Sequence, residues 1–224
     1  MANRRQISRA ALGAALFFCT GVSASRADSA SDQALIEAAG RGDAAAVRSL
    51  LSAGANVRAR DGQGRTALLA ATHANRIDAA RILLAAGADV NAKDNIEDSP
   101  FLYAGAEGRN EILKMTLAAG ADLKSTNRYG GTALIPAAHH GHPETVRILL
   151  ATRIDKDHIN KLGWTALLEA VILGDGGPVH TDIVRQLVAA GSNIAIADRD
   201  GVTALAHAQR RGFTAMAAIL SGVR

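Results

Sequence analysis

Histidine is the potentially catalytic or metal-ligating residue type that clusters most closely in this sequence. The stretch His139-His140-Gly141-His142, with Glu144 nearby, holds side chains of the kind that ligate metal ions. Adjacent residues on a helix do not share a face, however, so neighbouring histidines cannot easily turn toward one ion. An enzyme or metal-binding protein that uses His139 and His140 is therefore the alternative hypothesis, and we expect no resident metal or cofactor.

Other catalytic patterns are missing from the sequence. It contains no Gly-x-Ser-x-Gly elbow and no phosphate loop. Gly174 to Val179 lacks the Lys and the Ser or Thr of such a loop, so we interpret it as a surface insertion between helices. Cys19 is the only cysteine, and it lies in the apolar N-terminal stretch. The rest of the chain can form neither a disulfide nor a thiolate site. We expect no catalytic residues and no enzymatic activity.

Composition and charge restrict the remaining classes. The 224 residues are 48% hydrophobic, 21% charged and only 3% aromatic, which indicates a globular chain whose core consists of Ala, Leu, Ile and Val. The formal net charge is +4, but four arginines and no acidic residue precede Asp28. The chain beyond is close to neutral, so we expect no nucleic-acid partner, because phosphate binding needs an excess of basic residues on one face.

The N-terminal segment has the layout of a secretory signal peptide. A basic stretch (residues 1–9) precedes an apolar stretch (10–24), and small residues follow at Ala24 and Ala27. We predict a signal peptide over residues 1–27 with cleavage after Ala24 or Ala27. The apolar stretch is shorter than the ~20 residues that span a bilayer, so we expect no stable membrane insertion after its removal.

The export route stays open between two alternatives. Asn3-Arg4-Arg5-Gln6-Ile7 resembles the twin-arginine export signal, although Ser8 occupies a position that is usually apolar there, and the general secretory route is the other. A lipid anchor at Cys19 would need a small preceding residue, which Phe18 is not. We expect a periplasmic or, alternatively, a secreted protein.

A repeat of 33 residues organises the rest of the chain. Thr66, Ser99, Thr132 and Thr165 are each 33 residues apart, and Thr203 follows after 38 because residues 175–179 are inserted. A second marker, Leu-Leu-x-Ala-Gly-Ala, recurs in the same phase, for example at Leu83 to Ala88. Two markers in phase predict a stack of similar units.

Each unit reads as two short helices and a connector. The Thr or Ser markers are good N-caps, and Ala67, Pro100 and Ala133 then stand at the first helical position. Glycines end the second helix where a left-handed residue is favoured: Gly54, Gly87, Gly120 and Gly191. The connector turns out and back as a hairpin, with recurring Asp61, Asp94 and Asp198 as turn residues.

These features resemble the ankyrin repeat family, whose 33-residue unit carries the pattern T-P-L-H-x-A. The resemblance implies an all-α solenoid of about six helix-turn-helix units joined by β-hairpin-like loops within residues 28–224. We place the units at about 31–60, 61–93, 94–126, 127–159, 160–197 and 198–222. His142 and His180 fall on the family's step between the two helices, where histidine is ordinary.

Two positions depart from the pattern. Glu97 and Arg153 stand where sister units have glycine, and a non-glycine residue held at positive φ costs of order 1 kcal/mol. We expect a strained or altered turn at both.

The resemblance also implies a function, which is binding another protein through the hairpin tips and the concave face. Such a protein would act as a scaffold, an inhibitor or a protective partner. Mapped onto the repeat, the partner-binding candidates are Ile96, Glu107, Tyr129, His139, His140, Leu162, Trp164, Ile172 and Leu173. The alternative is that these side chains pack on adjacent tips. We expect a monomer.

Overall fold

The computed structural model describes the backbone of residues 21–222 and the side chains of residues 29–222. Most of the predicted signal peptide, residues 1–20, lies outside these ranges, together with the twin-arginine-like stretch and Cys19. Within them the chain forms 12 helices and no strand beyond the single bridge between Ala197 and Thr203. The helices are α1 (Gly21–Arg41), α2 (Ala44–Ser52), α3 (Ala67–His73), α4 (Ile77–Ala85), α5 (Pro100–Ala106), α6 (Asn110–Ala118), α7 (Leu134–His139), α8 (Pro143–Leu150), α9 (Ala166–Ile172), α10 (Pro178–Ala189), α11 (Ala204–Arg210) and α12 (Thr214–Gly222).

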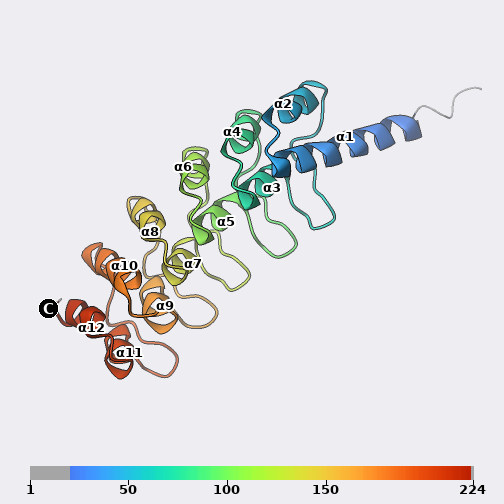
Figure 1. The fold of residues 1–224 in the computed structure, drawn as a ribbon. Coiled ribbons are helices and arrows are strands. Elements are labelled where there is room, and N and C mark those ends of the chain that lie inside the picture. The colour runs from blue at the N-terminus through green and yellow to red at the C-terminus, as the bar shows by residue number, and fades with distance from the viewer. Residues whose placement is uncertain (1–20, 223–224) are drawn as a thin grey trace, which may run out of the picture.

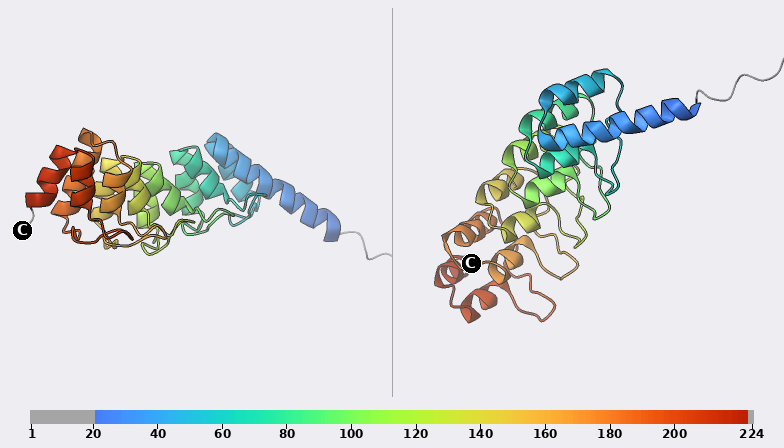
Figure 2. Two further views of the ribbon diagram at one scale, coloured as in Figure 1. Left: turned by 90° about the horizontal axis from the view of Figure 1, so that it is seen from below. Right: turned by 45° about the vertical axis from the view of Figure 1, so that its right-hand side comes forward.

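The helices form two parallel rows, with long loops projecting from one side (Figure 1). The first helix of each unit packs against the first helices of the adjacent units, in the order α1, α3, α5, α7, α9 and α11. The second helices of the units form the other row, and the loops lie on the side away from them (Figure 2). These second helices are α2, α4, α6, α8, α10 and α12. The predicted all-helical solenoid is confirmed.

Small and aliphatic side chains fill one continuous core along the stack. One column of the repeat supplies four large members of this core, since Leu68, Phe101, Leu134 and Leu167 are 33 residues apart and almost completely buried. Alanines between them allow close approach of neighbouring first helices. The low aromatic content of the sequence is therefore consistent with the tight spacing of the rows.

The predicted N-caps are confirmed in four units. The hydroxyls of Thr66, Ser99, Thr165 and Thr203 each accept a hydrogen bond from the amide three residues on, at 3.2 to 3.3 Å. Each satisfies an amide of the first helical turn that has no partner within the helix.

The predicted N-cap at Thr132 is wrong. In sister units the amide four residues after the marker donates to the marker's carbonyl, but here that position is Pro136, which has no N–H. The Ile135 amide takes over this carbonyl at 3.1 Å, and the Thr132 hydroxyl is left buried without a partner. The helix consequently starts at Leu134, and Ala133 is its N-cap rather than its first residue.

The predicted helix ends are confirmed at Gly54, Gly87, Gly120 and Gly191, all of which have positive φ. Glu97 also has positive φ, at 67°, as its place among tip glycines predicted.

At Arg153 the turn is altered rather than strained, because this residue is not among those with positive φ. Thr152 explains the difference. Its hydroxyl donates to the Leu149 carbonyl at 2.6 Å and accepts from the Ile154 amide at 3.1 Å. In the unit with Gly87, the amide equivalent to that of Ile154 reaches back to the helix carbonyl of Leu83 directly. The threonine bridge replaces that closure and removes the need for a left-handed residue.

The inserted residues 175–179 are only partly a surface loop. Pro178 and Val179 belong to α10, whose first position proline suits. The expectation of an insertion entirely between helices is therefore wrong for these two residues.

No helix within residues 21–222 combines the length and the apolar content needed to cross a membrane.

Candidate functional site

One side-chain arrangement fixes the tip of every hairpin. The Oδ1 atom of the first turn residue accepts from the backbone amides two and four residues on, at 2.9 to 3.0 Å. This holds for Asp61, Asp94, Asn127, Asn160 and Asp198. The predicted turn role of the three aspartates is confirmed, and the two asparagines share it. Equivalent residues are therefore presented at equivalent places along the stack.

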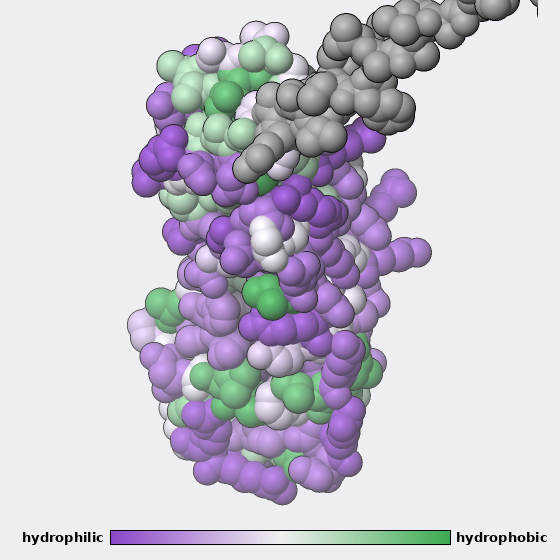
Figure 3. Space-filling model, turned by 90° about the vertical axis from the view of Figure 1, so that its right-hand side faces the viewer, coloured by the Kyte–Doolittle hydropathy of each residue, from purple (hydrophilic) through white to green (hydrophobic). Residues whose placement is uncertain are grey.

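Three consecutive tips carry large apolar side chains, which we call the tip row: Ile96, Tyr129 and Leu162. Their exposed fractions are 50%, 52% and 46%. The backbone links the tips of Tyr129 and Leu162, because the Lys161 amide donates to the Tyr129 carbonyl at 2.9 Å. Viewed from the side of the hairpins, the surface shows separate apolar patches among hydrophilic side chains (Figure 3).

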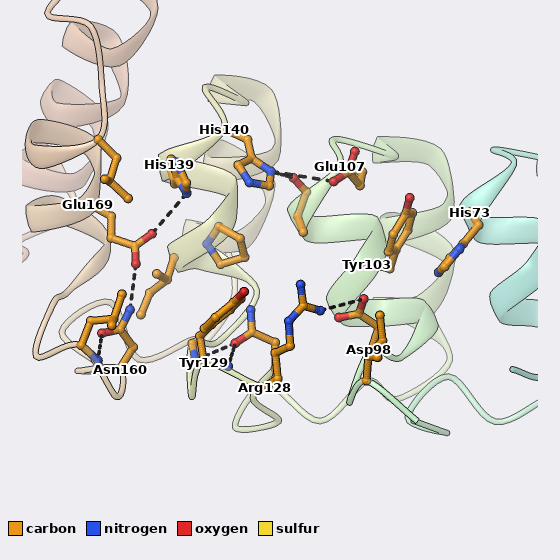
Figure 4. A pocket seen from close by; sticks show the side chains of 18 residues that line it. His73, Asp98, Tyr103, Glu107, Arg128, Tyr129, His139, His140, Asn160 and Glu169 are labelled. Carbon is orange, nitrogen blue, oxygen red and sulfur yellow. Dashed lines mark hydrogen bonds and ion pairs between the residues drawn. The ribbon is translucent and has the colours of Figure 1, made fainter. Parts of the chain in front are cut away.

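The tip row borders a groove of about 570 Å³ between the hairpins and the ends of α5, α7 and α9 (Figure 4). Glu107, His140 and Leu173 are the C-cap residues of these three helices, so the end of each first helix brings one side chain to it. The groove is lined by His73, Ile96, Asp98, Tyr103, Ala106, Glu107, Asn127, Arg128, Tyr129, Gly131, Ile135, Pro136, His139, His140, Asn160, Leu162, Glu169 and Leu173.

Seven of the nine sequence-predicted candidates line this groove, and two do not. Trp164 and Ile172 are half-buried and pack against the core instead. Trp164 therefore packs on the core, whereas the tip row and Leu173, which is 42% exposed, remain open to solvent.

The groove also contains residues that the sequence analysis missed. Tyr103, Pro136 and Glu169 all lie four residues after a Thr or Ser marker, in one column of the repeat. That column contains Ala70 and His207 in the flanking units, so its variation was a usable signal. Asp98 and Arg128, beside the tip row, were likewise not selected.

Glu169 is the most deeply buried charged residue of the groove, with a side chain 7% exposed. Its Oε1 accepts from the Asn160 amide nitrogen at 2.7 Å, while its Oε2 lies 3.7 Å from His139 Nδ1, beyond hydrogen-bond distance. Burial raises the pKa of this carboxyl, and the Asn160 hydrogen bond only partly opposes the shift.

Asp98 is the second confined carboxylate. Burial, followed by the charge of Asp94, raises its pKa, and the Arg128 guanidinium opposes this from 4.0 Å. The Arg128 guanidinium also makes a cation–π contact with the Tyr129 ring, whose centroid lies 4.8 Å from the guanidinium carbon.

The histidines of the groove are held by aromatic and backbone contacts. His73 stacks on Tyr103 with ring centroids 3.8 Å apart, and burial lowers the pKa of His73 and of His139. His140 Nδ1 lies 2.8 Å from the Ala106 carbonyl, which can only accept, so this nitrogen carries a proton.

The alternative metal site gains no geometric support. Across the part of the chain whose side chains are described, no three His, Cys, Asp or Glu residues gather as metal ligands. Outside the groove, His180 Nε2 lies 2.9 Å from the carbonyl of His139 in the preceding unit. His180 thus links two units of the scaffold, as its place on the interhelical step predicted.

A family model described as "Ankyrin repeats (3 copies)" matches residues 10–94 and 101–198. Among solved structures, a crystal structure of an ankyrin repeat domain from Acinetobacter baumannii AYE is 56% identical, with a TM-score of 0.81, covering 84% of this chain and 95% of that one. The ankyrin repeat protein EF0377 is 43% identical, with a TM-score of 0.83, covering 86% and 98%.

A third structure contains a protein complex. It is described as the Bd0816 predatory endopeptidase from Bdellovibrio bacteriovorus in complex with the immunity protein Bd3460. The matched chain is 26% identical, with a TM-score of 0.72, covering 85% of this chain and 98% of that one. No curated protein matches the chain.

Proposed function

The chain belongs to the ankyrin repeat family, and we propose that it is an exported module that binds another protein through its hairpin tips and concave face. The observation that carries the proposal is the tip row, three large apolar side chains about half exposed at equivalent positions of consecutive units. Large apolar side chains that line up on a rigid surface favour burial against a partner.

The rigidity of the tips supports the same function. Each tip is fixed by the two Oδ1 hydrogen bonds of its first turn residue, and the tips of Tyr129 and Leu162 are also joined by the backbone bond from Lys161 to Tyr129. A partner therefore meets side chains that are already in place, so less conformational entropy is lost on binding.

The role of such binding is proposed from the family and from one relative. The Bdellovibrio structure pairs an endopeptidase with an immunity protein, so a chain of this shape occurs in a complex between proteins. We assign the present protein to the same broad group of scaffolds, inhibitors and protective partners. Because the matched family model describes repeats, we propose no catalytic role.

Export is proposed from the sequence of residues 1–27 alone, in which basic, apolar and small residues follow one another in the order of a signal peptide. The intact mass of the mature protein tests it. A mass beginning at Asp28 or Ser25 supports cleavage after Ala27 or Ala24, and a mature protein that retains residues 1–24 in the membrane fraction contradicts it.

Affinity purification from the native envelope tests the binding function. The tagged mature protein is compared with the double variant Tyr129→Ala, Leu162→Ala, and with Val179→Ala as a control. Val179 is an exposed apolar residue of similar accessibility on α10, away from the tip row. A partner captured by the native protein and by the control, but not by the double variant, is the expected result. Equal capture by all three places the binding surface elsewhere.

A further inference from the structure

The groove beside the tip row carries more negative than positive charge. Three carboxylates line it, Asp98, Glu107 and Glu169, against a single guanidinium, that of Arg128. Because burial lowers the pKa of His73 and His139, these imidazoles are neutral near pH 7 and do not balance the carboxylates.

Among the described residues that line the groove, the one guanidinium is held away from the deepest carboxylate. Arg128 faces Asp98 at 4.0 Å and lies over the Tyr129 ring, whereas Glu169 lies on the far side of Tyr129 in Figure 4. His139 Nδ1 lies 3.7 Å from Glu169 Oε2. Within the part of the chain whose side chains are described, this oxygen accepts no hydrogen bond, although the Glu169 side chain is only 7% exposed.

The surroundings of Glu169 suit a long side chain with an apolar stem. Ile135, Pro136, Leu162 and Leu173 line the same groove as the carboxylate. Arginine and lysine bury their methylene groups against such surfaces while directing the charged head to an acceptor. A cation at Oε2 would complete the hydrogen bonding of a carboxylate that is otherwise destabilised by burial.

Together these features identify the chemistry of the partner. We propose that the groove takes an extended peptide segment of the partner protein in which an Arg or Lys side chain, flanked by apolar residues, forms an ion pair with Glu169. The flanking residues cover the tip row, and Asp98 and Glu107 add attraction for further basic residues. This inference rests on the proposed protein-binding function and specifies the partner segment.

A peptide selection tests it without knowledge of the natural partner. A displayed library of random linear peptides is selected on the mature protein, and the strongest binders are synthesised. Each binder is measured against the native protein and Glu169→Gln, and each is also made with citrulline or norleucine in place of its Arg or Lys. Glu111→Gln is the matched control, because it removes an exposed carboxylate on α6 that lies outside the groove.

The glutamine variant keeps the fold, because its side-chain carbonyl still accepts from Asn160, and its melting temperature verifies this. We expect binders enriched in Arg or Lys between apolar residues. Their affinity should be about tenfold weaker for Glu169→Gln and unchanged for Glu111→Gln. The neutral peptide analogue should bind both proteins equally, which identifies Glu169 and the cation as a coupled pair.

The remaining outcomes separate this inference from the function on which it rests. Binders that are lost in the Tyr129→Ala, Leu162→Ala variant but lack a basic residue, or that ignore Glu169→Gln, overturn the cationic segment and leave the binding surface standing. A selection that yields no binder sensitive to the tip row or to the groove counts against both.

Discussion

The backbone amide of Ile135 donates to the carbonyl oxygen of Thr132 at 3.1 Å instead of to its hydroxyl. Pro136 causes this tighter turn, because it cannot supply the amide that occupies the equivalent carbonyl in sister units. The Thr132 hydroxyl is buried with no partner as a result.

That difference predicts opposite effects of one substitution in two units. Thr132→Val should stabilise the protein by about 1 kcal/mol, because it removes an unsatisfied buried hydroxyl and keeps the shape of the side chain. Thr66→Val should cost about 1 kcal/mol, because the hydroxyl of Thr66 caps α3. Thermal and urea unfolding of both variants measure the effect, and equal changes in the two would contradict the geometry.

A second pair of variants tests the backbone at positions where sister units have glycine. Glu97→Gly should stabilise the protein by about 1 kcal/mol, because Glu97 has a φ of 67°. Arg153→Gly should instead destabilise it by about 0.5–1 kcal/mol, because Arg153 does not need positive φ and glycine increases the entropy of the unfolded chain. The midpoints of urea unfolding distinguish these results. An Arg153→Gly variant more stable than the native protein would contradict the explanation based on Thr152.

Tyr129 and Trp164 should differ in what their truncation changes. Tyr129→Ala should leave the melting temperature nearly unchanged and weaken partner capture, because this side chain is 52% exposed. Trp164→Ala should lower the free energy of unfolding by about 2 kcal/mol, because Trp164 packs against the core. Calorimetry and quantitative capture of the two single variants check this. A large loss of stability for Tyr129→Ala would mean that the tip row is packing rather than an interface.

The buried carboxylate of Glu169 predicts a stability that depends on pH. Its pKa is raised in the folded state, so its contribution is fully favourable below the unfolded value of 4.5 and is lost as pH rises through the folded value. Glu169→Gln resembles the protonated acid and should therefore melt a few degrees higher near pH 7, with the difference vanishing toward pH 4. A difference that does not depend on pH would argue against burial as the cause.

The buried histidines predict the opposite slope at higher pH. Burial lowers the pKa of His73 and His142 in the folded state, so their contribution is fully present above the unfolded value of 6.5 and declines as pH falls through the folded values. The free energy of unfolding should therefore decrease between about pH 7 and pH 5.5. The double variant His73→Gln, His142→Gln should flatten that decrease, and an unchanged slope would assign it to other groups.

The sequence by itself determined the architecture, because each unit repeats the same local instructions. The capping hydroxyls, the left-handed glycines and the turn residues such as Asp61 act on amides and carbonyls only a few residues away. Their meaning can therefore be predicted from spacing alone. The tip row was predicted for the same reason, since equivalent residues of a regular repeat line up.

Single residues outside the repeat pattern cause the two local departures from it. Pro136 prevents the cap at Thr132 because it lacks an amide N–H, and Thr152 allows the turn at Arg153 without positive φ because its hydroxyl bridges the turn. Both effects act over a few residues, but each depends on whether an amide, that of Ile135 or Ile154, donates to a hydroxyl or to a carbonyl oxygen. The backbone geometry of the folded unit determines which of these hydrogen bonds forms.

The groove was decided by the tertiary structure. Trp164 and Tyr129 belong to adjacent tips and look alike in the sequence, yet one packs on the core and the other faces solvent. Burial raises the pKa of Glu169, and no pattern within its own unit indicates this. Desolvation depends on all the atoms around a charge, so it is fixed only when the units stack, whereas hydrogen-bonded turns are fixed by the residues within them.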